Sequence, residues 1–130
     1  MLTKEYIMSY RVYFEDTDLM GIMYHARYLC FFDRARTDML RAQGVSLTSL
    51  AHNDTYFAIR DIQIRYHFPA RLDDTLNIIS YIEQKKACTL QFKQIMLNQS
   101  EQRIAEATVL TVIVDQNLKP KRIPDKLIGG

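Results

Sequence analysis

The sequence predicts an α+β fold, in which a curved antiparallel sheet of about five strands is wrapped around one long central helix. Three observations support this prediction. Apolar and polar residues alternate near the start of the chain, apolar residues then recur at three- and four-residue steps over 26–43, and several long strand-like segments follow one after another. Because strands and helices do not alternate, a doubly wound parallel sheet is not expected.

The first two elements are a strand and the helix. Residues 6–15 have a period of two that predicts one buried face, made of Met8, Tyr10, Val12 and Phe14. Over 26–43 the period becomes helical, and the apolar stripe consists of Tyr28, Phe32, Ala35, Met39 and Ala42. Gly44 follows, at the place where a left-handed C-terminal cap is expected.

The second half of the chain predicts strands joined by turns. Residues 45–57 are ambiguous between a short helical turn and a loop. The expected strands are residues 61–68, 75–84, 88–97 and 104–115. The last of them is apolar on both faces, which predicts a central strand and a second copy of the chain packed on the far face of the sheet. The tail from Gln116 contains Pro120 and Pro124 and is not expected to continue the sheet interior.

Composition limits the class of protein. The 130 residues predict one domain over 1–130, and 17 basic against 15 acidic residues leave a charge too balanced to predict nucleic-acid binding. The longest apolar runs are far shorter than the ~20 residues of a membrane-spanning helix, and no secretory signal is visible. Cys30 and Cys88 share no metal-binding or redox spacing, so we expect reduced thiols and a cytoplasmic location.

The segment between the first strand and the helix is the most informative one. EDTDLMGIMYHARYL, residues 15–29, sets three acids, a glycine and a histidine against an apolar helix. A helix N-terminus has unpaired backbone N–H groups and a partial positive charge, which suit an oxygen that becomes an oxyanion. A carboxylate such as Asp18 could act there as nucleophile or as general base, or it could simply be a turn acid.

Residues 11–41, RVYFEDTDLMGIMYHARYLCFFDRARTDMLR, resemble the hotdog-fold acyl-CoA thioesterases of the 4-hydroxybenzoyl-CoA thioesterase family, in particular their Tol–Pal-associated, YbgC-type branch. The residues that carry the resemblance are Arg11-Val12, Thr17-Asp18, Gly21-Ile22, YHARYL (24–29), FFDRART (31–37) and RYHFPARLDD (65–74). The resemblance covers nearly the whole chain. It implies a five-stranded antiparallel sheet around a central helix, and homodimers or dimers of dimers with an active site between subunits.

The resemblance also implies which residues carry the activity. The family's catalytic aspartate falls on Asp18, and the backbone N–H that polarises the thioester carbonyl falls near His25, whose side chain is a second catalytic candidate. Arg27 stands where the family commonly has asparagine, so the helix entrance departs from the family pattern here. The candidate substrate-binding residues are Gly21, Tyr24, Arg27, Tyr66 and Phe68.

Plainer interpretations stand beside these. Asp18 is also compatible with a turn acid, His25 with a helix cap, and Tyr66 and Phe68 with core residues of a strand. A metal site from Asp16, Asp18 and His25 is not expected, because two acids two residues apart and one histidine are a weak ligand set. No cofactor is expected, since coenzyme A is part of the substrate. Glu15 and Asp16 are expected to be solvated or salt-bridged.

The predicted function is hydrolysis of an acyl-CoA thioester. One alternative is a hotdog hydratase or dehydratase acting on an acyl thioester. Another is a protein that binds acyl thioesters, acyl carrier protein or a Tol–Pal partner without turnover. The sequence leaves open the acyl chain length and the choice between coenzyme A and acyl carrier protein as the acyl donor.

Overall fold

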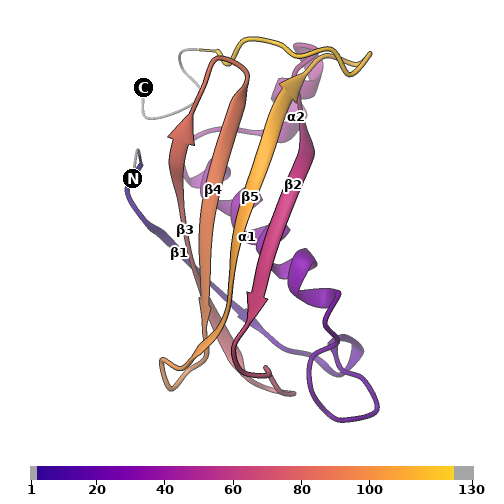
Figure 1. The fold of residues 1–130 in the computed structure, drawn as a ribbon, viewed down its shortest axis with the longest axis vertical. Coiled ribbons are helices and arrows are strands. Elements are labelled where there is room, and N and C mark those ends of the chain that lie inside the picture. Colours follow the sequence, from indigo (N-terminus) through magenta and orange to yellow (C-terminus); the bar gives the residue numbers. More distant parts are fainter. Residues whose placement is uncertain (1–2, 125–130) are drawn as a thin grey trace.

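A computed structural model describes residues 3–124 of the chain. Its elements are β1 (Tyr6–Arg11), the short 3-10 turn η1 (Phe14–Asp16), α1 (Arg27–Ala42), α2 (Leu47–His52), β2 (Tyr56–Tyr66), β3 (Thr75–Lys85), β4 (Thr89–Leu97) and β5 (Arg103–Val114). The five strands form one antiparallel sheet in the order β1-β3-β4-β5-β2, so β1 and β2 are its edges. Both helices lie behind the sheet in Figure 1, and the predicted α+β fold is confirmed.

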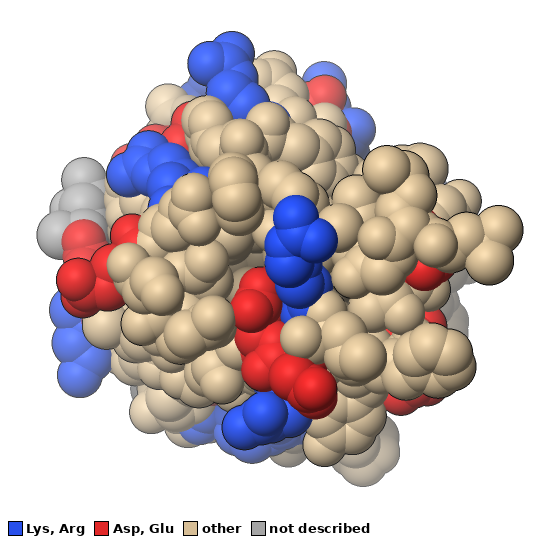
Figure 2. Space-filling view, turned by 90° about the horizontal axis from the view of Figure 1, so that it is seen from below, with Lys and Arg blue, Asp and Glu red and all other residues tan. Residues whose placement is uncertain are grey.

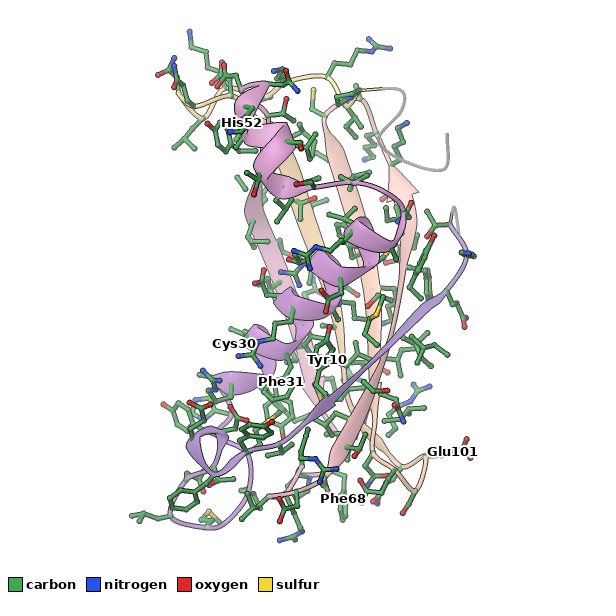
Figure 3. The ribbon with its side chains drawn as sticks, turned by 180° about the vertical axis from the view of Figure 1, so that it is seen from behind. Tyr10, Cys30, Phe31, His52, Phe68 and Glu101 are labelled. Atoms are coloured by element: carbon green, nitrogen blue, oxygen red, sulfur yellow. The ribbon has the colours of Figure 1, made fainter. Side chains whose placement is uncertain are left out.

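The core lies between α1 and the sheet. The predicted stripe of α1 is buried at Tyr28, Phe32, Ala35 and Met39, whereas Ala42 at the helix end is exposed. Alternate residues of the sheet face this stripe, among them Ile78, Phe92 and Val109. Seen from the helix side in Figure 3, α1 crosses the sheet diagonally, and its Phe31 meets Tyr10 of β1 edge-on with 6.2 Å between ring centroids.

The first strand is shorter than predicted. It ends at Arg11, and η1 follows over residues 14–16. Val12 is fully buried as expected, but Phe14, which the period of two assigned to the core, is 81% exposed. The Asp16 carboxylate accepts a hydrogen bond from the backbone N–H of Tyr13 at 2.9 Å, which favours the turn and ends the alternation. The assignment of Phe14 to the buried face was wrong for this reason.

The ambiguous stretch 45–57 contains α2 and the start of β2. Ser46 caps α2 by accepting a hydrogen bond from the backbone N–H of Ser49 at 3.3 Å. The next strand begins at Tyr56, five residues earlier than predicted. Its pairing register with β5 shifts between Ile59 and Asp61. This bulge at residue 60 reverses the alternation, so the period read from residue 61 onward does not extend backward.

β5 lies between β4 and β2, as predicted for a central strand. Its inward residues are buried, while its outward residues, such as Glu106 and Leu110, are half-buried on the face that no helix of the described chain covers (Figure 1). Within residues 3–124 no helix has the length and apolar character that a bilayer crossing requires. The predicted domain limits, residues 1 and 130, lie outside the described residues.

Candidate active site

Asp18 stands in a tight loop between η1 and α1. An isolated bridge between Thr17 and Met23 closes the loop. Inside it, the backbone N–H of Asp18 donates to the carbonyl of Ile22, and the N–H of Gly21 donates to the carbonyl of Asp18, both at 3.0 Å. Gly21 has a φ of 75°, in the left-handed region that favours glycine. Glycine at this position therefore allows the turn without backbone strain.

The carboxylate of Asp18 has one hydrogen-bond partner among the described residues. Its Oδ1 accepts a hydrogen bond from the backbone N–H of Met20 at 2.8 Å. The second oxygen, Oδ2, receives no hydrogen bond from any residue between 3 and 124, and the residue is exposed. Figure 2 shows the end of the molecule that carries this loop, where acidic and basic side chains are intermixed. Asp18 is therefore a turn acid that still presents a free carboxylate oxygen.

Asp16 connects the loop to the first turn of α1. Its side chain is 4% exposed, and its Oδ1 accepts hydrogen bonds from Nη2 and Nε of Arg27 at 2.7 and 3.0 Å. The hydrogen bond to Asp16 raises the pKa of Arg27. A cation at a helix N-terminus opposes the helix dipole, and this buried anion offsets that effect. Asp16 is salt-bridged, one of the two states expected for it.

The start of α1 presents unpaired backbone donors. The N–H of Arg27 donates to the carbonyl of Tyr24 at 2.9 Å, but no described residue accepts a hydrogen bond from the N–H of His25 or Ala26. The hydroxyl of Tyr66, from β2, donates to the carbonyl of His25 at 2.8 Å. This bond ties the first turn to the sheet, and the peptide group of residues 25 and 26 is held in place by it.

An apolar hollow lies beside these donors. It measures about 310 Å³, and its lining includes Ile22, His25, Tyr28, Tyr66 and Phe68. Tyr66 is 46% exposed and Phe68 is 41% exposed, so the interpretation of these rings as core residues is wrong. Tyr66 meets Tyr28 edge-on at 4.9 Å between centroids. Partial burial raises the pKa of Tyr66, a shift in the direction that favours the protonated, donating hydroxyl.

Comparison with known proteins identifies the family. The family model described as the thioesterase-like superfamily matches residues 12–129, nearly the whole chain. The chain belongs to the thioesterase-like superfamily. This match and the relatives described next confirm the predicted resemblance to hotdog thioesterases of the YbgC type.

Relatives of this thioesterase-superfamily chain are found among sequences and solved structures. It is 40% identical over 120 residues to the acyl-CoA thioester hydrolase YbgC of Escherichia coli O6:H1, covering 92% of this chain and 90% of the relative. It is 36% identical over 129 residues to the acyl-CoA thioesterase YbgC of Haemophilus influenzae, covering 98% and 94%. The crystal structure of a probable thioesterase from Bartonella henselae has a TM-score of 0.89 at 33% identity, covering 93% and 100%.

In this superfamily member the fold gathers some of the predicted site residues and separates others. His25, Tyr66 and Phe68 line one hollow, and the ring of Tyr24 lies 4.5 Å from that of His25. Asp18 and Gly21 belong to the adjacent loop, which joins the hollow through Ile22. The guanidinium of Arg27 is turned to Asp16, so its role in substrate binding stays a prediction.

Asp16 is the residue whose importance sequence reasoning missed. It was weighed as one solvated or paired acid among three, yet it holds the loop to the helix through Arg27, through Tyr13, and through its own carbonyl, which accepts from the N–H of Tyr24 at 2.9 Å. The sequence did contain a signal for this role of Asp16, namely arginine rather than the family's usual asparagine at position 27. A cation in the first turn of a buried helix requires a nearby acid, and Asp16 is one of the few within reach.

Proposed function

We propose that this chain hydrolyses acyl-CoA thioesters to the free acid and coenzyme A. In this proposal Asp18 is the catalytic carboxylate, and the backbone N–H groups at the start of α1, those of His25 and Ala26, bind the carbonyl oxygen. One observation carries the proposal: the Asp18 loop contributes Ile22 and Met23 to the lining of an apolar hollow, beside the N–H groups of His25 and Ala26, which have no acceptor in residues 3–124.

Two catalytic routes could use these groups, and both begin with the same hydrogen bonds to the thioester. The unpaired N–H groups donate to the thioester oxygen as it becomes an oxyanion. As nucleophile, Asp18 forms a bond to the acyl carbon while the carbon–sulfur bond breaks, coenzyme A leaves as a thiolate that takes up a proton, and water then cleaves the mixed anhydride. As general base, Asp18 takes a proton from water, which attacks the acyl carbon directly. Label found in Asp18 after single-turnover hydrolysis in ¹⁸O water establishes the nucleophilic route, because only an anhydride that water opens at the Asp18 carboxyl carbon carries the label into the side chain.

The hollow at the helix start is proposed to hold the part of the substrate that adjoins the thioester group. Phe68 and Tyr66 supply apolar surface, and Tyr66 also orients the peptide group of His25 through its hydroxyl. Gly21 allows the close turn that brings Asp18 to this place, and Tyr24 packs against His25. The His25 side chain is exposed and stays a candidate for acid–base assistance.

The active form is proposed to be a homodimer or a dimer of dimers. β2 is an edge strand that pairs with β5 on one side only, and it carries exposed apolar side chains, including Ile59 and Tyr66. The hollow opens beside its end. A second copy that pairs at this edge covers these side chains and encloses the otherwise exposed Asp18. This enclosure also excludes water from the oxyanion site, which strengthens its hydrogen bonds.

The proposed location is the cytoplasm, and both Cys30 and Cys88 are free thiols, which suits a reducing compartment. Acyl carrier protein as a second acyl donor and a link to the Tol–Pal system remain predictions from the family resemblance. Comparing rates on the same acyl group attached to coenzyme A and to acyl carrier protein tests the donor.

The test is thiol release from a panel of acyl-CoA thioesters by the wild type and by Asp18→Asn. Asparagine keeps Oδ1 as acceptor for the Met20 N–H, so the loop turn is retained while the negative charge is lost. We expect turnover to fall by about a hundredfold or more with an unchanged melting temperature. Glu15→Gln, which changes an exposed acid in the same segment, is the matched control and should keep wild-type turnover.

Three results would contradict the proposal. Asp18→Asn could retain full turnover, the wild type could bind acyl-CoA tightly without releasing thiol, or it could add water to crotonyl-CoA without releasing coenzyme A. The second result would favour a binding protein, and the third a hydratase.

A further inference from the structure

A second hollow lies farther along α1, on the helix-facing side of the sheet. It measures about 130 Å³ and is bounded by α1, α2 and the start of β2. Most of its lining is apolar: Leu40, Leu47, Phe57, Ile59 and Phe92. Arg36 is the single cationic side chain in this lining, and no step of the proposed hydrolysis uses it.

Arg36 is held from inside the core. Its side chain is only 10% exposed, and its Nη1 donates to Oε1 of Gln94 at 3.0 Å. The amide nitrogen of Gln94 donates to the carbonyl of Phe32 at 2.9 Å and to the hydroxyl of Ser80 at 3.0 Å. Gln94 and Ser80 are fully buried. Because both donors of the amide are used inside the core, its oxygen is left to face Arg36.

The positive charge of Arg36 has only a weak counter-charge. Oδ1 of Asp33 lies 3.4 Å from Nη2 of Arg36, a distance longer than the roughly 2.7–2.9 Å usual for a charge-assisted hydrogen bond. The Asp33 side chain is 70% exposed, so water competes for it. Burial lowers the pKa of Arg36, and Asp33 opposes that shift. Of the five N–H donors of a guanidinium, residues 3–124 use only these two contacts.

The two hollows lie beside α1 at opposite ends of β2, and their linings have no residue in common. The end of β2 meets the helix start through the bond from Tyr66 to His25, and the start of β2 joins Arg36 at the second hollow. Between them lie the half-buried, inward-facing Ile62 and Ile64. From the helix start to Arg36 the axial distance is about 15 Å at 1.5 Å per residue, a span that an extended acyl chain bridges.

We propose that the second hollow receives the far end of the acyl chain, and that Arg36 selects chains ending in a carboxylate. This inference rests on the proposed thioesterase function and specifies its substrate class. The carboxylate would accept the hydrogen bonds that the core leaves unused on Arg36, while Asp33 turns to water. The apolar walls exclude water around this pair, so a chain ending in a methyl group would leave the buried cation without a close counter-charge.

The test compares dicarboxylic mono-CoA thioesters, from glutaryl-CoA to dodecanedioyl-CoA, with methyl-ended acyl-CoA thioesters of equal length. For the wild type we expect kcat/KM to favour the carboxylate-ended substrate by about tenfold or more at the chain length that reaches Arg36. In Arg36→Met this ratio should fall toward one, and Arg36→Lys should give an intermediate ratio. Arg34→Met removes an exposed arginine of the same helix and should leave the ratio and the basal rate unchanged.

Two results would overturn the inference: a wild type without preference at any chain length, or an Arg36→Met protein that keeps the full preference. If Arg36→Met does not fold, the wild-type panel and Arg36→Lys decide the question. If no thioester is hydrolysed at all, the proposed function fails separately. Calorimetric binding of non-hydrolysable thioether analogues with carboxylate and methyl ends then still shows whether Arg36 discriminates between them.

Discussion

Asp16 and Asp18 are two residues apart in the chain and differ in what their carboxylates contact. Asp16 is buried and receives hydrogen bonds from Arg27 and Tyr13, so both of its oxygens are used within the protein. Asp18 is exposed and uses one oxygen for the N–H of Met20. A carboxylate engaged on all sides stabilises structure, whereas one with a free oxygen is available for a reaction. The two acids therefore predict opposite results on substitution.

For Asp16→Ala we expect a loss of stability. The substitution removes two hydrogen bonds from Arg27 and leaves that cation at the helix N-terminus without its anion, which should lower the free energy of unfolding by about 2–3 kcal/mol. Urea unfolding measures this, and Glu15→Ala, at an exposed site, should stay within about 0.5 kcal/mol of the wild type. In a double-mutant cycle, Arg27→Ala should cost much less in the Asp16→Ala background. Equal effects of Asp16→Ala and Glu15→Ala would contradict this assignment.

Tyr66→Phe tests the tie between the sheet and the helix start. Phenylalanine keeps the ring beside Tyr28 but removes the hydroxyl that donates to the carbonyl of His25. We expect kcat to fall about fivefold with little change in KM, since one neutral hydrogen bond contributes about 1 kcal/mol and here holds the oxyanion donors. Steady-state kinetics give the split, and a changed KM with unchanged kcat would indicate a substrate contact instead.

At the scale of elements, the hydrophobic periodicity was sufficient to predict which residues are buried wherever no local hydrogen bond or bulge interrupted the element. The inward faces of β3 and β4 and the stripe of α1 were predictable, because each alternation is unbroken over the residues that matter. The end of β1 and the start of β2 were not. The hydrogen bond from the Tyr13 N–H to the Asp16 carboxylate ends the alternation after β1, and the bulge at residue 60 interrupts the alternation within β2. Neither effect changes the hydrophobic pattern, so the pattern contains no sign of them.

The candidate site shows the same division. The Gly21 turn beside Asp18 is local, and it lies within the segment 15–29 that the sequence singled out. The bond from Tyr66 to His25 joins residues 41 positions apart, and the Arg36–Gln94 pair joins residues 58 apart. Such contacts depend on how β2 and β4 are placed against α1, which a reading of local spacing does not provide.

An ion cluster on the outer face of the sheet makes stability depend on pH. Oε2 of Glu106, in β5, lies 2.8 Å from Nη1 of Arg103 and 3.5 Å from Nε2 of His67. Its Oε1 lies 3.9 Å from Nζ of Lys93. Burial alone would raise the pKa of Glu106, but these neighbours together hold it below its usual 4.5. A carboxyl with a lowered pKa in the folded state stabilises the fold above 4.5, and this contribution is lost as the pH falls through the folded pKa.

Glu106→Gln should therefore reduce the free energy of unfolding at pH 7 by roughly 0.5–1 kcal/mol. The difference from the wild type should shrink below pH 4.5 and in high salt, as measured by denaturant titrations across pH. A difference that stays constant from pH 7 to pH 3 would show that the Glu106 charge is not its cause.

At the scale of the whole molecule, the two edges of the sheet differ in the surroundings of their exposed apolar residues. Ile59 of β2 is 49% exposed and borders the hollow that contains Arg36, whereas Ile7 of β1 is 61% exposed at the opposite edge. The proposed dimer uses the β2 edge, because pairing there covers both hollows at once. The β1 edge provides a matched control of similar exposure.

Ile59→Lys should weaken the dimer, since it places a charge among the apolar side chains that the second copy covers. Sedimentation velocity should show a shift toward monomer and a parallel loss of thiol release. Ile7→Lys should sediment like the wild type. A monomeric wild type, or two variants that behave alike, would contradict the use of the β2 edge.

The most direct measurement is a crystal structure of the protein with a ketone analogue of an acyl-CoA, in which a methylene group replaces the sulfur. We predict that the carbonyl oxygen accepts a hydrogen bond from the N–H of His25 or Ala26, and that the Asp18 carboxylate lies about 3–3.5 Å from the carbonyl carbon or one water away. A carbonyl bound elsewhere, or an Asp18 carboxylate directed away from the carbonyl carbon in the complex, would contradict the assignment of Asp18 and the helix start as the catalytic groups.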